Sequence, residues 1–126
     1  MEFSGAEWRI MLVVWRHPSV TVNDVHLALR EETGWAYSTV KTMLSRLAAK
    51  GALEVAKSGK QSVFRPLVSR DSARREATSS LLDRVFEGAV GGLFQHLLGE
   101  RRVSKKDREQ ILALLQKEEN EQGKKK

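Results

Sequence analysis

The hydrophobic positions within residues 35–51 recur at helical spacing and predict a helix with one buried side. Val40, Met43, Leu44 and Leu47 follow the i, i+3, i+4, i+7 spacing of a helix packed on a core. The opposite side carries small hydroxyl residues and basic side chains, and it has no acidic residue. A helix that needs only to be soluble usually mixes both signs of charge. This face is therefore typical of a surface that approaches a polyanion.

Two amphipathic stretches precede this helix. Ser4 begins a capping-box pattern that predicts a helix over about residues 5–16, which Pro18 ends. After a short β-branched stub, Thr21 caps a second helix over about residues 22–32. The predicted buried side of this second helix is Val22, Val25, Leu27, Ala28 and Leu29.

A hairpin is predicted directly after the basic helix, which Gly51 ends. Residues 53–57 alternate loosely as a strand, Gly59 suits the turn, and residues 61–65 form the returning strand. Helix, turn, basic helix and hairpin together predict a mainly α protein with a winged helix-turn-helix DNA-binding domain. We place this domain at residues 1–68.

Three further helices are predicted in residues 69–126, over about residues 70–87, 90–98 and 105–115, followed by a frayed tail of basic and acidic residues from Lys117. These helices are too short and too one-sided to bury their apolar faces alone. We therefore predict a dimerisation region that pairs with the same segment of a second chain. The alternative is a monomer whose helices fold back on the first domain. The predicted dimer contacts are Leu81, Val85, Phe86, Leu93, Phe94, Leu97, Ile111, Leu114 and Leu115.

Composition narrows the classes of partner and chemistry. The net charge is +6, and residues 36–66 hold six basic side chains against one acidic residue, so a polyanionic partner such as double-stranded DNA is favoured. The chain has no cysteine, which excludes disulfides and thiolate sites. His17, His26 and His96 are scattered. We therefore expect no catalytic set, no metal site and no cofactor, and so no enzyme. No apolar run is long enough to span a bilayer, so we expect no membrane insertion and a cytoplasmic location.

The order of motifs resembles the BlaI/MecI/CopY family of bacterial transcriptional repressors. The resemblance rests on Trp8 and Trp15 in the first helix, on residues 39–47 with the Lys50-Gly51 stop, and on the basic wing. It covers nearly the whole chain and implies a winged-helix head, a helical dimerisation tail and repression at an inverted repeat. The family's copper-responsive branch carries Cys-x-Cys motifs, which are missing here.

The resemblance also implies residue roles. Ser38, Thr39, Lys41, Thr42 and Arg46 match the family's base and phosphate contacts. The sequence departs from the family at Ala36, in place of a Ser cap, and at Tyr37, in place of Pro. The full set predicted to bind DNA is Tyr37, Ser38, Thr39, Lys41, Thr42, Ser45, Arg46, Lys50, Lys57 and Lys60.

A proteolytic switch is a further implication of the resemblance. The antibiotic-responsive branch is inactivated when a membrane sensor metallopeptidase triggers cleavage in the short tail helix. The aligned bond here joins His96 to Leu97, and cutting it would detach the last helix from the dimer core.

Several readings remain open from sequence. Lys41 and Arg46 can read base edges, contact phosphates only, or merely solvate the helix. Lys57 and Lys60 can meet phosphate or the minor groove, or form a solvated hairpin tip. A winged helix can also use the same face to bind another protein, so a protein-interaction adaptor is the alternative function.

Overall fold

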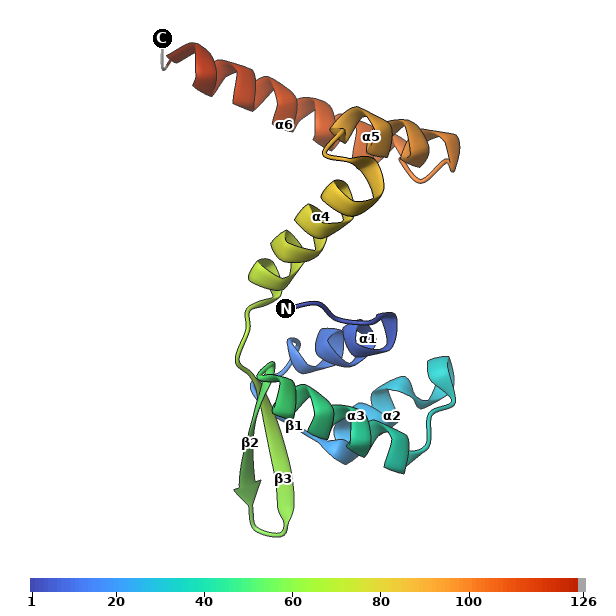
Figure 1. Cartoon of the computed structure of the whole chain (residues 1–126), viewed down its shortest axis with the longest axis vertical. Coiled ribbons are helices and arrows are strands. Elements are labelled where there is room, and N and C mark those ends of the chain that lie inside the picture. Colours follow the sequence, from blue (N-terminus) through green and yellow to red (C-terminus); the bar gives the residue numbers. More distant parts are fainter. Residues whose placement is uncertain (125–126) are drawn as a thin grey trace. The chain divides into compact units, whose positions relative to one another are not determined.

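The computed structural model describes residues 1–124, and the chain divides into two compact units, Met1–Ser79 and the residues from Ser80 onward. Each unit is described by itself. The elements in chain order (Figure 1) are α1 (Gly5–Val14), β1 (Val20–Thr21), α2 (Val22–Thr33), α3 (Tyr37–Lys50), β2 (Leu53–Ser58), β3 (Gln61–Pro66), α4 (Arg70–Phe86), α5 (Val90–Gly99) and α6 (Lys105–Lys124).

The first unit is a winged helix, as the sequence predicts. Its three helices enclose one hydrophobic core, which the sheet closes with Leu53 of β2 and Phe64 of β3. The antiparallel sheet has the order β1-β3-β2, with Val20 opposite Phe64. The hairpin pairs Ser58 with Gln61 across a two-residue loop, and Gly59 in that loop has a φ of +66°, a conformation that favours glycine.

The helix ends follow the predicted local chemistry. Ser4 and Thr21 both form complete capping boxes, and Gly51 ends α3 in the left-handed conformation. The first helix ends at Val14 rather than near residue 16, with Trp15 as its C-cap. A terminal difference of this size is ordinary for a fraying helix end.

Two sequence predictions about burial and order are corrected. Leu27 and Ala28 are exposed rather than buried, because Val22, Val25 and Leu29 define the inner face of α2 and the other two lie outside it. The predicted frayed tail is helical over residues 117–124, where Glu, Lys and Gln favour helix and Gln122 donates to Glu118 one turn away. Residues 125–126 of that prediction lie outside the described part of the chain.

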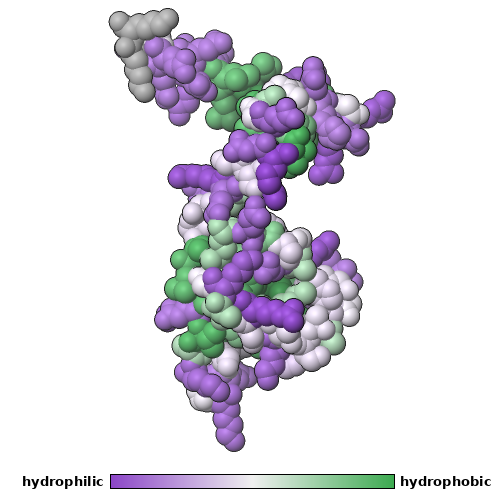
Figure 2. Space-filling view, viewed as in Figure 1, coloured by the Kyte–Doolittle hydropathy of each residue, from purple (hydrophilic) through white to green (hydrophobic). Residues whose placement is uncertain are grey.

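The second unit has no buried core within the described chain, since no residue from 80 to 124 is classed as buried. Apolar side chains gather on the surface of α5 and α6, where Figure 2 shows hydrophobic patches. α4 begins in the first unit and ends in the second, so the boundary between the two compact units falls inside a helix.

Candidate nucleic-acid interface

The exposed face of α3 is set by its buried face. Val40, Leu44 and Leu47 are fully buried, which turns the intervening positions outward at the helical period. A shallow depression of about 270 Å³ on the outer side is lined by Ser38, Thr39, Thr42, Met43 and Arg46. The predicted residues Tyr37, Ser38, Thr39, Lys41, Thr42, Ser45 and Arg46 are all exposed on this helix.

The Thr42 hydroxyl is partly committed inside the helix. It donates to the backbone carbonyl of Ser38 at 3.0 Å. The hydroxyl hydrogen is therefore engaged, while its oxygen lone pairs and its methyl group remain available to a ligand.

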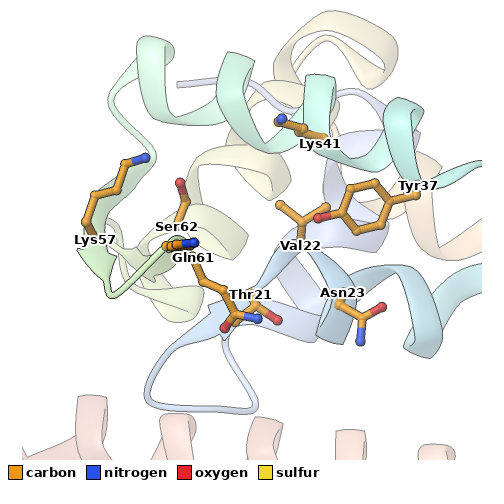
Figure 3. A pocket seen from close by; sticks show the side chains of 9 residues that line it. Thr21, Val22, Asn23, Tyr37, Lys41, Lys57, Gln61 and Ser62 are labelled. Atoms are coloured by element: carbon orange, nitrogen blue, oxygen red, sulfur yellow. The ribbon is translucent and has the colours of Figure 1, made fainter.

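A second depression, of about 200 Å³, lies between α3, the wing and the start of α2 (Figure 3). It brings together three of the predicted basic residues, Lys41, Lys57 and Lys60, and also contains Tyr37. The other lining residues, which the sequence analysis missed, are Thr21, Val22, Asn23, Gln61 and Ser62.

The missed residues are close to the lysines only because the fold brings them there. β1 and β3 pair side by side, which places the residues at the start of α2 next to the returning strand of the wing. None of the side chains that line this cleft is acidic in the described part of the chain. Ammonium groups, hydroxyls and amides converge on one cleft, a combination that suits a phosphate oxygen.

Tyr37 is positioned by a neighbour on α2. The rings of His26 and Tyr37 meet edge to face, with centroids 5.9 Å apart and an interplanar angle of 83°, which is a favourable aromatic geometry. Tyr37 remains 47% exposed. At the sequence departure that precedes it, Ala36 is the N-cap of α3 and makes no side-chain capping hydrogen bond.

Lys50 does not join the other predicted DNA-binding residues. Its ammonium group contacts the backbone carbonyl of Glu2, lies 3.2 Å from a carboxylate oxygen of Glu7 and sits 5.3 Å from the ring centre of Phe3. The Lys50 charge is therefore compensated within the first unit. Lys50 therefore contributes to the packing of the N-terminal segment, and its predicted contact with DNA stays a prediction.

The Glu7 carboxylate is held by several donors. Partial burial raises the pKa of Glu7, but hydrogen bonds from Ser4 and the nearby charge of Lys50 together leave its pKa below the usual value. Glu7 therefore stays ionised at neutral pH and stabilises Lys50 at this position.

The residues predicted to form a dimer lie on the helices of the second unit and the end of α4. Phe86, Leu93, Leu97 and Ile111 are half-buried. The others remain exposed on the single chain, and these are Leu81, Val85, Phe94, Leu114 and Leu115. An apolar depression of about 210 Å³ is lined by two of these residues, Phe94 and Ile111, together with Leu98, Val103, Arg108 and Leu112.

Other kinds of site find no support in residues 1–124. Their histidine and acidic side chains form no group of three that could hold a metal ion. None of the helices in this range is long and apolar enough to cross a membrane. His96 and Leu97 both lie within α5, and the centroids of the His96 and Phe86 rings are 6.3 Å apart.

The three-helix core, the antiparallel wing and the basic exposed face of α3 define a winged helix-turn-helix domain of the DNA-binding class. The chain belongs to the penicillinase repressor family, whose model matches residues 3–117. That family consists of transcriptional repressors rather than enzymes.

Individual relatives support this assignment. The penicillinase repressor of Bacillus licheniformis is 29% identical over 119 residues, which cover 94% of this chain and 93% of the relative. The methicillin resistance regulatory protein MecI of Staphylococcus aureus is 22% identical, with 92% of this chain and 94% of the relative covered.

Two solved structures match a little over half of this chain. The DNA-binding domain of the repressor BlaI is 37% identical with a TM-score of 0.52, and the match covers 56% of this chain and 87% of that one. A Bacillus licheniformis BlaI monomer in complex with the blaP half-operator is 36% identical with a TM-score of 0.51, covering 57% and 88%.

Proposed function

We propose that this chain is a homodimeric transcriptional repressor that binds two half-sites of a pseudo-palindromic operator in double-stranded DNA. The observation that carries the proposal is the exposed face of α3, which has no acidic residue. It is flanked by the three-lysine cleft, the depression that Lys41, Lys57 and Lys60 line. The relatives support the repressor class, since they are a penicillinase repressor and MecI. The BlaI structure with a half-operator supports DNA as the partner.

The geometry suggests separate roles for the two depressions. An α-helix fits the major groove of B-DNA, where Arg46 can meet a base edge and the small side chains of Ser38 and Thr39 allow close approach. The three-lysine cleft suits the backbone that borders the groove, because lysine binds phosphate as a point charge. In this arrangement α3 supplies sequence readout and the cleft fixes its register.

The dimer part of the proposal rests on unburied apolar surface. Leu112, Leu114 and Leu115 on α6 are 59%, 60% and 54% exposed, and Val85 on α4 is 61% exposed. Burying one such side chain contributes about 1.5–3 kcal/mol. A second copy presents the same surface, so an isologous contact buries both at once.

Repression in this proposal is steric. A dimer that occupies two half-sites within a promoter blocks the binding of RNA polymerase. Control by a membrane sensor metallopeptidase that leads to cleavage between His96 and Leu97 stays a prediction. That bond lies inside α5, so the helix must open locally before a protease can bind it, and a cut there would separate α6 from α4. A cytoplasmic location also stays a prediction.

The test is binding of the full chain to the DNA upstream of its own gene. Fluorescence anisotropy with a labelled duplex, competed by unlabelled duplex of the same or scrambled sequence, measures specificity. Footprinting then locates the half-sites. We expect protection of two related half-sites and strong preference over the scrambled competitor. Equal competition by both duplexes would contradict the proposal and favour the protein-interaction adaptor.

A further inference from the structure

The segment between the wing and α4, residues 67–68, is hydrogen-bonded to the rest of the first unit. The backbone N–H of Leu67 donates to the carbonyl of Ala52 at 2.9 Å. The indole N–H of Trp15 donates to the carbonyl of Val68, also at 2.9 Å, across 53 positions of the chain. The Val68 side chain packs against the core. Two consecutive residues are thus tied to different parts of the first unit.

Trp15 is itself held in one orientation. It is the C-cap of α1 and packs against the core. Its ring lies 5.8 Å from that of Trp8 and 6.5 Å from that of Phe3, and Phe3 and Trp8 meet edge to face at 5.5 Å. The ammonium group of Lys50 lies over the Phe3 ring of this aromatic cluster. The direction of the indole N–H is therefore determined by the cluster and not by Val68 alone.

The first turns of α4 are also held, by a helix cap and by a buried residue. Ser69 caps this helix by accepting from the N–H of Ser72 at 3.0 Å. Ala73 is 6% exposed and is the one residue of α4 that is buried in the described chain. The chain reaches the second unit only through α4, so these contacts determine how the helix leaves the winged-helix head.

We infer that Trp15 is a positioning residue that determines which half-site spacing the repressor accepts. The inference rests on the proposed dimeric, operator-binding function. If the two heads are joined to a common dimer through α4, a fixed exit of α4 permits one separation and rotation between the heads. If the orientation of α4 relative to the head is not fixed, each head can reach its half-site independently, and such a flexible connection tolerates many half-site spacings.

DNA geometry makes spacing a sensitive readout. A helical turn contains about 10–10.5 base pairs, so two added base pairs rotate one half-site by about 70° relative to the other. A rigidly joined pair of heads cannot follow this rotation without strain. A single head bound to one half-site does not sense it.

The experiment compares Trp15→Phe with Trp8→Phe. Both variants keep an aromatic ring in the same cluster and lose one indole N–H, and the N–H of Trp15 is the one bonded to the segment before α4. Affinity is measured for three labelled duplexes: the natural operator found by footprinting, the same operator with two added base pairs, and a single half-site. Each affinity ratio between the natural and lengthened operators reports spacing discrimination.

We expect Trp15→Phe to reduce the discrimination ratio about twofold to tenfold, the range that one intramolecular hydrogen bond supports, with unchanged half-site affinity. Trp8→Phe should keep the wild-type ratio. A second variant, Ala73→Glu, should reduce the ratio further by displacing the first turn of α4, and its half-site affinity reports whether the head is folded.

The outcomes separate the inference from the function on which it rests. A wild-type discrimination ratio in Trp15→Phe and in a folded Ala73→Glu variant would overturn the positioning role of Trp15. It would leave the proposed operator binding untouched. An equal reduction in Trp8→Phe would also overturn it, since general loosening of the cluster would then be the cause. Absence of wild-type half-site binding would instead contradict the proposed function.

Discussion

The two units of this chain differ in how they treat their hydrophobic residues. The first unit encloses a continuous core, with Ile10, Val40 and Leu47 among the side chains at 0% exposure. In the second, α5 and α6 bury no residue fully, and Leu98 and Leu112 are more than half exposed. Similar amphipathic helices therefore complete a domain in one case and leave a surface uncovered in the other.

The difference follows from the hairpin and from the helix arrangement of the first unit. There, a sheet closes the space between three helices. The second unit has only helices within the described residues, and an apolar helix face must be covered by another element to be stable in water. The first unit therefore buries its own apolar residues, while the second presents the apolar surface that the proposed dimer would cover.

Separating the two units should have the largest effect. We expect a fragment of residues 1–79 to unfold cooperatively, with a midpoint that does not depend on concentration. A fragment of residues 69–126, which keeps all of α4, should lose most of its helical circular dichroism on dilution, because short isolated helices are marginal in water. Concentration-independent helicity of the second fragment would show that it covers its own apolar surface.

A point change in α6 is expected to have the next largest effect. Leu115→Asp places a charge in the predicted dimer contact, where an unpaired buried charge is strongly unfavourable. We expect a monomer in sedimentation velocity and at least a hundredfold weaker binding to the full operator. Half-site binding should change little.

Ala113→Asp is the matched control for that change. Ala113 is exposed and lies on the opposite side of α6 from Leu115 at the helical period. It should leave both the dimer and operator affinity near wild type. Equal dissociation by both variants would place the contact elsewhere on the helix.

Much of the first unit can be predicted from the sequence because its signals are local. The bounds of α3, both predicted strands and the caps at Ser4 and Thr21 depend on neighbours within a few residues. The outward position of Arg46 follows from helical period alone. These features needed no knowledge of tertiary contacts.

Features that depend on distant contacts escaped the sequence analysis. The ion pair between Lys50 and Glu7 joins residues 43 positions apart, so the sequence alone did not indicate it. Thr21 and Asn23 join the basic cleft only because β1 pairs with β3. The exposure of Leu27 depends on which side of α2 faces α1 and α3, and several registers of that face were compatible with its composition.

Removing one basic side chain from α3 should have an intermediate effect. If Arg46 contacts DNA, Arg46→Ala should weaken binding by about 1–3 kcal/mol per half-site when it reads a base, or lower the salt slope by about one per half-site when it meets phosphate. Titration at several salt concentrations separates these roles. Arg75→Ala removes the same charge from the exposed part of α4 and should leave both affinity and salt slope close to wild type. Wild-type values for Arg46→Ala would remove it from the interface.

The smallest predicted effects concern two capping carboxylates, the first of which is Glu7, which links the N-terminal cap to Lys50. Because its pKa is lowered in the folded protein from a usual value of 4.5, the carboxylate stabilises the fold above that pH. This contribution decreases as the pH falls through the lowered pKa. We expect Glu7→Gln to reduce the free energy of unfolding at pH 7, and to approach wild type as the pH falls below the lowered pKa of Glu7. Chemical denaturation across this pH range measures the difference. Asp107→Asn alters the corresponding cap of α6, where Ser104 lowers the pKa of Asp107 without a lysine partner, so a smaller loss is expected there. A Glu7→Gln difference that does not shrink as the pH is lowered through the acid range would mean that its charge is not what stabilises this contact.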